Sequence, residues 1–142
     1  MVNQMLRKLI PWLAAILGIA LVVIGTEYLA SESGEVVVLR TNDVAGASYE
    51  TRLWVVDHDG ALWLRAGNPK GGWFSRISER RKVALVRGGQ MLLLDAVAAP
   101  EARDTINDLM QQKYGFADSY INFFFPRANK IPVRLTPSAP VP

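Results

Sequence analysis

An uncharged apolar run near the N-terminus constrains this chain more than any other feature. Residues 9–26, LIPWLAAILGIALVVIGT, contain no charged side chain. Roughly 18 residues at ~1.5 Å rise per residue give roughly 27 Å of helix, close to the hydrocarbon thickness of a bilayer. Trp12 and Tyr28 bracket the run, and amphipathic aromatic residues favour the two membrane interfaces. The run predicts an N-terminal membrane anchor helix over residues 1–30.

A cleaved signal peptide and a buried core helix are the two alternatives for this run. The apolar part of a signal peptide is usually about 7–15 residues long and ends at small residues. Here the run is longer, and the best cleavage site would place the bulky Tyr28 two residues before Ala30. A core helix of this length normally has a polar face, which this run lacks. We therefore expect an uncleaved anchor, while cleavage stays open.

Charged residues on either side of the run predict its orientation. Arg7 and Lys8 precede it, whereas Glu27, Glu32 and Glu35 follow it. The positive-inside rule weighs Lys and Arg, so it places the N-terminus in the cytoplasm. The sequence thus predicts a single-pass membrane protein whose C-terminal domain lies outside the cytoplasm, in the periplasm if the source is Gram-negative.

The remainder predicts one mainly β domain with one or two helices, because short alternating runs are joined by turn residues. Residues 31–35 are expected to be a linker, residues 36–136 the domain, and residues 137–142 a disordered Pro-rich tail. A short helix is predicted over 73–81 and a longer one over 100–114, with a compact aromatic segment at 118–127. The six predicted strands are 35–41, 49–57, 61–67, 82–87, 90–98 and 130–137.

The composition gives little support to a protein nucleophile or a metal site. The chain has no Cys, and its single His, His58, sits between Asp57 and Asp59 in a predicted hairpin turn. A histidine in such a turn is usually exposed and inert, and an Asp-rich hairpin turn is common. The chain also has no P-loop and no G-x-G-x-x-G motif.

Cations gather around the Gly-rich stretch 67–72. Arginine forks and loop N–H groups suit a phosphate, although a solvated charged face explains the same pattern equally well. The net charge is only +3, so nucleic acid is not an expected partner. The cations are Arg65, Lys70, Arg76, Arg80, Arg81, Lys82 and Arg87.

Aromatic residues next to this stretch could contact a planar ring. Trp73 and Phe74 follow the Gly-rich stretch directly and are the better candidates for a ligand contact. Trp54 and Trp63 lie in predicted strands, and we interpret both as core residues.

The stretch TRLWVVDHDGALWLRAGNPKGGWFSRISERRKVALVRGG, residues 51–89, resembles a split β-barrel of the flavin- and deazaflavin-binding superfamily. The superfamily includes pyridoxamine-phosphate-oxidase-like proteins and the deazaflavin-dependent nitroreductase family. The similar order is a strand pair around DG, a strand ending in a small-residue loop, an aromatic pair leading a short helix, and a strand with VAL. The ending NKIPVRLTP also resembles the closing strand of the nitroreductase-like group. The resemblance implies an FMN-binding-like split β-barrel. With the six predicted strands and the apolar run, we expect a six-stranded split β-barrel after one transmembrane helix.

The resemblance also implies a cofactor site for FMN or a deazaflavin coenzyme, and often a homodimer. In this pattern Arg65, Ala66, Gly67 and Lys70 would face the cofactor phosphate. Trp73 and Phe74 would be the aromatic pair at the head of the short helix, and Arg76 could add charge. Replacing Arg65 by Ala is then expected to weaken cofactor binding and, provided that Arg65 is exposed, to leave the fold intact.

Two functions follow as hypotheses. The first is a membrane-anchored oxidoreductase-like protein that reduces a quinone- or nitro-like small molecule through the cofactor. The second is a non-enzymatic anchored split-barrel module that binds a protein or lipid partner. The second is favoured by the loop at residues 42–48, NDVAGAS, which lacks the Lys typical of deazaflavin binders.

Overall fold

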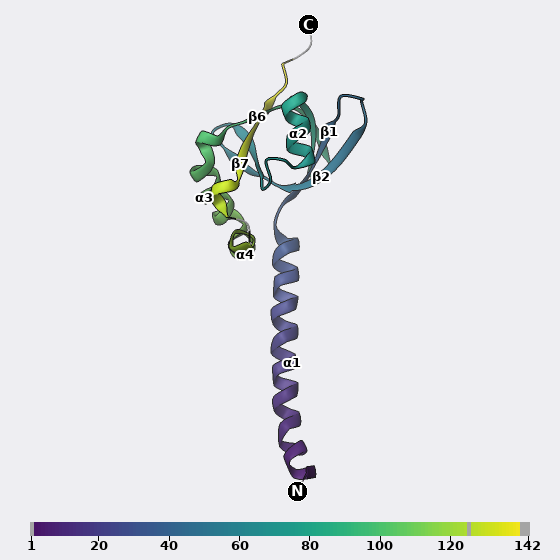
Figure 1. The fold of residues 1–142 in the computed structure, drawn as a ribbon, viewed down its shortest axis with the longest axis vertical. Helices are drawn as coiled ribbons and strands as arrows, with labels where there is room; N and C mark the ends of the chain where they lie inside the picture. Colours follow the sequence, from purple (N-terminus) through teal and green to yellow (C-terminus); the bar gives the residue numbers. More distant parts are fainter. Residues whose placement is uncertain (1, 125, 140–142) are drawn as a thin grey trace. The chain divides into compact units, whose positions relative to one another are not determined.

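The computed structural model describes residues 2–124 and 126–139 and divides the chain into two units. The first unit ends at Ser33 and is a single helix, α1 (Val2–Ser33), which runs without interruption (Figure 1). Within α1, the exposed segment Arg7–Ile24 is long and apolar enough to cross a membrane. The predicted apolar helix is therefore confirmed. A membrane anchor and a signal sequence both contain such a helix, so its role as an anchor stays a prediction. Because α1 continues through Ser33, only Gly34 and Glu35 of the expected linker precede the first strand.

The second unit is built on a seven-stranded antiparallel sheet that forms a split half-barrel. Its strand order is β2-β1-β5-β6-β7-β4-β3. The strands are β1 (Val36–Asn42), β2 (Ser48–Trp54), β3 (Val56–His58), β4 (Ala61–Ala66), β5 (Lys82–Arg87), β6 (Gln90–Ala98) and β7 (Ile131–Pro137).

Three α-helices belong to the described part of this unit: α2 (Gly72–Glu79), α3 (Arg103–Tyr114) and α4 (Phe116–Phe124). Helix α2 packs on β1 and β6, whereas α3 packs on β3, β7 and α4 (Figure 1). Two short 3-10 turns, Pro100–Ala102 and Arg127–Asn129, precede α3 and β7. The predicted helix at 73–81 is confirmed as α2, which ends at Glu79, and residues 118–124 of the aromatic segment lie in a full helix, α4, instead of a single turn.

The barrel interior holds the main hydrophobic core. Strand β1 alternates, so Val37, Leu39 and Thr41 are buried while their neighbours are more exposed. Ile77 of α2 closes one side of this core. A second apolar cluster, which includes Ile106, Met110 and Tyr114 of α3, packs on β3 and β4. Helix α3 therefore covers the strands that lead into the candidate site.

The predicted turn at Asp59 and Gly60 is confirmed. The two residues have φ angles of 51° and 71°, the left-handed region that Asp tolerates and Gly adopts freely. This turn joins β3 to β4 and so fixes the register in which Trp63 faces Val56.

The predicted count of six strands is corrected to seven, because the segment expected as one strand at 49–57 breaks at Val55. The Tyr114 hydroxyl accepts a hydrogen bond from Val55 N–H at 3.0 Å and lies 2.9 Å from the Val55 carbonyl oxygen. Lys113 Nζ donates to the same carbonyl at 2.8 Å. Side chains from α3 thus replace strand partners at Val55, and the chain leaves β1 to pair with β4.

Candidate functional site

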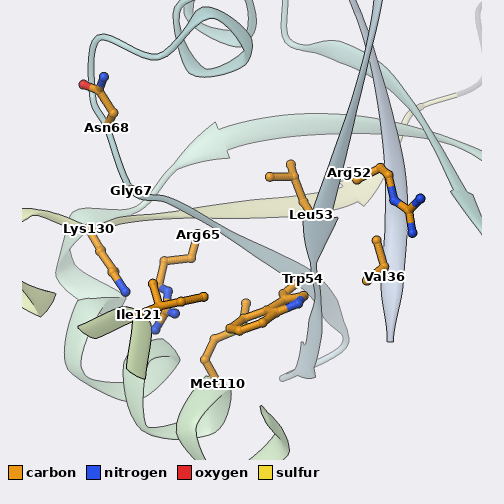
Figure 2. Close-up of a pocket in the computed structure, with 10 residues that line it drawn as sticks. All are labelled: Val36, Arg52, Leu53, Trp54, Arg65, Gly67, Asn68, Met110, Ile121 and Lys130. Carbon is orange, nitrogen blue, oxygen red and sulfur yellow. The ribbon is translucent and has the colours of Figure 1, made fainter. Parts of the chain in front are cut away.

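A cavity of about 500 Å³ lies between the sheet and the two helices α3 and α4. Arg65 and Lys130 line one side of it, and Leu53, Trp54 and Met110 line an apolar side (Figure 2). The lining residues are Val36, Arg52, Leu53, Trp54, Arg65, Gly67, Asn68, Met110, Ile121 and Lys130.

Arg65 stands at the end of β4 and is held by two side chains from the helices. Its Nη2 pairs with Asp118 of α4, and its Nη1 donates to Asn107 Oδ1 of α3 at 3.1 Å. The Arg65 side chain is only 6% exposed and that of Asp118 is fully buried. From the sequence, Arg65→Ala is expected to leave the fold intact only if Arg65 is exposed. Because Arg65 is buried, that condition is not met.

Lys130, which immediately precedes β7, is the second of the three cations that line the cavity, and the third, Arg52, is exposed. Lys130 is only 3% exposed, and its Nζ donates to Asn122 Oδ1 of α4. Among the described residues, no carboxylate lies within ion-pair distance of its ammonium group. Burial, with a further contribution from the nearby Arg65, lowers the pKa of Lys130 to about 8. In Figure 2 the ends of Lys130 and Arg65 point toward each other beside Ile121.

The charge around this end of the cavity is unbalanced. Asp118 pairs with Arg65, and Arg127 Nη2 lies 3.8 Å from its other oxygen. Asn122 Nδ2 also donates to Asp118 at 2.7 Å, which links this carboxylate to Lys130 through a neutral amide. Arg127 is partly exposed and also lies 3.6 Å from Asp108, so the two buried cations, Arg65 and Lys130, have one buried carboxylate between them. A buried charge without a counter-ion is costly, so an anionic group in the cavity would complete the arrangement.

The apolar side of the cavity carries a flat aromatic wall. The Trp54 ring stacks on Tyr114 with ring centroids 4.4 Å apart and planes 8° from parallel. Met110, fully buried, lies beside Trp54 and also lines the cavity. A planar apolar group could pack against this wall. Binding would cost little conformational entropy, because the Trp54 and Tyr114 side chains are already held by their stacking.

The loop after β4 brings backbone to the cavity. A Cβ added to Gly67 would meet no atom within 4 Å, so open space adjoins this glycine. Asn68 orders the loop, because its Oδ1 accepts from Lys70 N–H and its carbonyl accepts from Gly71 N–H, both at 2.9 Å. The Lys70 side chain is exposed and is not among the cavity lining.

The other residues expected from the sequence lie elsewhere. Ala66 is buried in β4 opposite Ile131. Trp73 and Phe74 are half-buried, meet edge to face at 6.0 Å, and pack against the barrel core. Arg76 Nε donates to Thr41 Oγ1 at 2.8 Å, and its guanidinium lies 4.2 Å from the centre of the Tyr49 ring. Of the expected residues, the structure brings only Arg65 and Gly67 to the cavity.

The sequence did not predict that Lys130 and Trp54 line the cavity. Lys130 is the first residue of the predicted strand 130–137, which Pro132 suggested as an edge strand, where a lysine is normally exposed. Strand β7 instead pairs with both β6 and β4, and the Lys130 ammonium is buried against Asn122 of α4. Trp54 packs against the second apolar cluster, as we expect of a core residue, but it is only partly buried and also forms a wall of the cavity. The described residues hold no group of three or more His, Asp or Glu that could bind a metal ion, and His58 is exposed.

Comparisons with known proteins identify the fold. No family model matches the chain, and no curated protein matches its sequence. Several solved structures are similar in fold, all at low sequence identity. HutZ, the heme storage protein from Vibrio cholerae, is 12% identical over 78% of this chain and 86% of that chain, with a TM-score of 0.61.

Two further similar structures carry names that refer to cofactor-dependent enzymes. The F420-H2 dependent reductase FDR-A is 18% identical over 70% of this chain and 93% of that chain, with a TM-score of 0.57. A candidate pyridoxamine 5′-phosphate oxidase from Listeria innocua is 10% identical over 79% of this chain and 90% of that chain, with a TM-score of 0.55. The second unit of this chain therefore has the split-barrel fold of the pyridoxamine-phosphate-oxidase-like proteins, as the resemblance in its sequence implied.

Proposed function

We propose that this chain binds a flavin or deazaflavin cofactor in the cavity at Lys130 and reduces a quinone- or nitro-like small molecule. The observation that carries the proposal is the buried Lys130 ammonium, which has no carboxylate partner among the described residues and opens onto an apolar cavity. Such a site favours a ligand with an acidic group at one end and an apolar ring at the other.

The residues present fit this class of cofactor. Ligand cavities are typically about 300–1,000 Å³, and this one is about 500 Å³. Lys130 and Arg65 would hold the phosphate or carboxylate group, with the open backbone at Gly67 beside it. The stacked Trp54 would orient the ring, and Met110 would keep water from one side of it.

The chemistry would come from the cofactor, and the chain would bind and orient it. A reduced flavin or deazaflavin supplies a hydride, and a proton from water completes the reduction of a quinone to its hydroquinone. Lys130 keeps the acidic end fixed, and the apolar wall excludes water from the ring. This division of roles needs no protein nucleophile and is supported by fold neighbours that include an F420-H2 dependent reductase.

Five residues that the sequence predicted for the cofactor site lie outside the cavity, and we propose indirect or peripheral roles for them. Lys70 and Arg76 would contact the cofactor only where it extends along the loop beyond the cavity. Trp73, Phe74 and Ala66 would act through the packing that fixes the end of β4.

We also propose that α1 anchors the protein in a membrane, with its N-terminus in the cytoplasm and the second unit outside. The apolar segment Arg7–Ile24 and the cations at its start support this arrangement. A homodimer, common for this fold, belongs to the proposal as well.

The experiment is a turnover assay on the full chain purified in detergent. Oxidation of reduced FMN or reduced deazaflavin is followed by absorbance, with a short-chain quinone or a nitroaromatic compound as acceptor. We expect oxidation that saturates with cofactor and is weakened about tenfold to a hundredfold by Lys130→Met, since a charge-assisted bond contributes roughly 1.5–3 kcal/mol. The matched control is Lys82→Met, an exposed lysine on β5 outside this cavity.

The two negative results have different meanings. Cofactor binding without reduction of either acceptor would overturn the enzymatic part and favour a non-enzymatic anchored module. Absence of binding to both cofactors would overturn the cofactor proposal itself.

A further inference from the structure

Helix α4 presents an aromatic face to the outside of the second unit. The exposed fractions are 64% for Phe116, 52% for Tyr120, 83% for Phe123 and 58% for Phe124. These residues follow the i, i+4, i+7, i+8 spacing of one helix face. Charged and polar residues normally occupy the solvent-facing side of a surface helix, so this face is the reverse of the usual pattern.

Two polar residues of α4, Asp118 and Asn122, are turned inward, whereas Ser119 is exposed. Asp118 is fully buried against Arg65, and Asn122 hydrogen-bonds to Asp118 and Lys130. Ile121, on the same side, lines the cavity. The orientation of α4 is therefore fixed by a buried ion pair, and the aromatic face cannot turn inward without breaking it.

The exposed rings form one continuous patch. Phe116 and Tyr120 have ring centroids 6.4 Å apart, Tyr120 and Phe124 5.3 Å, and Phe123 and Phe124 5.2 Å. Contiguous apolar patches on soluble proteins usually mark a protein or membrane contact. No charged residue is exposed on α4, because its only acidic side chain is the buried Asp118. A surface without exposed carboxylates suits a bilayer that contains anionic lipids.

The point where the chain enters the second unit adjoins the start of α4. The Tyr114 hydroxyl lies 2.7 Å from the Glu35 carbonyl oxygen, and a Cβ on Gly34 would come within 2.7 Å of the Tyr114 ring. Hydrogen bonds from Arg87 and Lys113 hold Glu35 and keep its pKa below its usual value. Only one residue separates Tyr114 from the first residue of α4.

We infer that the aromatic face of α4 lies on the surface of the bilayer that α1 enters. About ten residues separate Ile24, the end of the apolar segment, from Gly34, and because α1 continues to Ser33 they span about 15 Å along the helix. A helix of aromatic residues with a large apolar face lies in the interfacial plane of a membrane. The tether and the patch thus lead to the same lipid surface. This inference rests on the proposed anchor and not on the proposed cofactor.

The test uses the absence of cysteine from the chain, which allows a single spin label at any chosen site. Phe123→Cys and, separately, Tyr120→Cys are labelled in the full chain reconstituted into vesicles of phosphatidylcholine and phosphatidylglycerol. The matched control is Val44→Cys, 69% exposed in the β1–β2 hairpin, on the other side of the second unit from α4 (Figure 1). The accessibility of each label to oxygen and to a water-soluble nickel complex is measured by electron paramagnetic resonance.

We expect the labels at 120 and 123 to be several-fold more accessible to oxygen than to the nickel complex, and the label at 44 to show the opposite preference. Equal nickel accessibility at all three sites would overturn the inference. Protection from both reagents, with dipolar broadening between labels, would also overturn it, because a second copy of the chain would then cover the face. Cofactor binding by the labelled variants is measured in parallel. If it is normal, a negative accessibility result contradicts the membrane contact of α4 and not the proposed cofactor site.

Discussion

Asp118 and Lys130 are two buried ionisable residues at the cavity end that Arg65 also lines, and they differ in how their charge is compensated. Asp118 has Arg65 as an ion-pair partner and Asn122 as a hydrogen-bond donor. Among the residues that the structure describes, Lys130 has only a neutral amide acceptor. The first residue therefore stabilises the fold, whereas the second leaves a positive charge available to a ligand.

Removal of Asp118 should destabilise the second unit severely. Asp118→Ala leaves Arg65 buried without its counter-ion, and breaking a buried pair in this way costs about 3–5 kcal/mol. The measurement is guanidinium unfolding followed by tryptophan fluorescence, with Asp104→Ala, an exposed acid in the first turn of α3, as the control. We expect the control to lose about 1 kcal/mol or less. Equal losses in the two variants would show that the buried pair does not support the fold.

The strand break at Val55 is the feature that joins the sheet to α3. Tyr114 bonds the Val55 backbone, stacks on Trp54 and contacts the chain at Gly34. One side chain therefore holds the end of β2, the aromatic wall of the cavity and the entry of the chain together.

Tyr114→Phe tests this element directly, because it keeps the ring and removes only the hydroxyl. The buried Val55 N–H then loses its acceptor, which should lower the free energy of unfolding by about 1–3 kcal/mol. Tyr49→Phe is the control, since its hydroxyl only donates to Asp43 at an exposed position. Thermal unfolding measures both variants. A Tyr114 variant as stable as the Tyr49 variant would mean that the strand break is held by other contacts.

Elements that depend on local sequence could be predicted. Elements that depend on contacts between distant residues could not. The residue types of Asp59 and Gly60 are sufficient to predict their turn. The apolar run of α1 can likewise be identified from its own sequence, without knowledge of any contact. The break at Val55 depends on Tyr114, which is 59 residues away. The site followed the same division: Arg65 and Gly67 were expected, but the burial of Lys130 depends on α4, which the sequence suggested only as a compact aromatic segment.

At the scale of the whole molecule, the distribution of cations around Arg7–Ile24 predicts one orientation. A reporter that is active only outside the cytoplasm, fused after Pro142, should be active in cells that express the chain. Changing Arg7 and Lys8 to Glu should reduce that activity, because the positive charge that holds the N-terminus inside is lost. If only a cytoplasmic reporter works at this position, the second unit lies inside, where reduced cofactors are made.

The dependence of FMN affinity on pH tests the proposed site most directly. Full-length protein in detergent is titrated with FMN from about pH 6.5 to about pH 9.5, with flavin fluorescence as the signal. The ammonium form of Lys130 predominates below its pKa of about 8, so the dissociation constant should be flat at low pH. Above about pH 8 it should rise toward tenfold per pH unit as the charge is lost.

Lys130→Met should bind FMN about tenfold to a hundredfold more weakly near pH 7 and show no such rise. We predict saturable binding of FMN to both proteins, with weaker binding and no rise of the dissociation constant with pH in Lys130→Met. A wild-type protein that binds neither FMN nor a deazaflavin, or a Lys130→Met variant with the same affinity and the same pH profile, would contradict the assignment of the cavity.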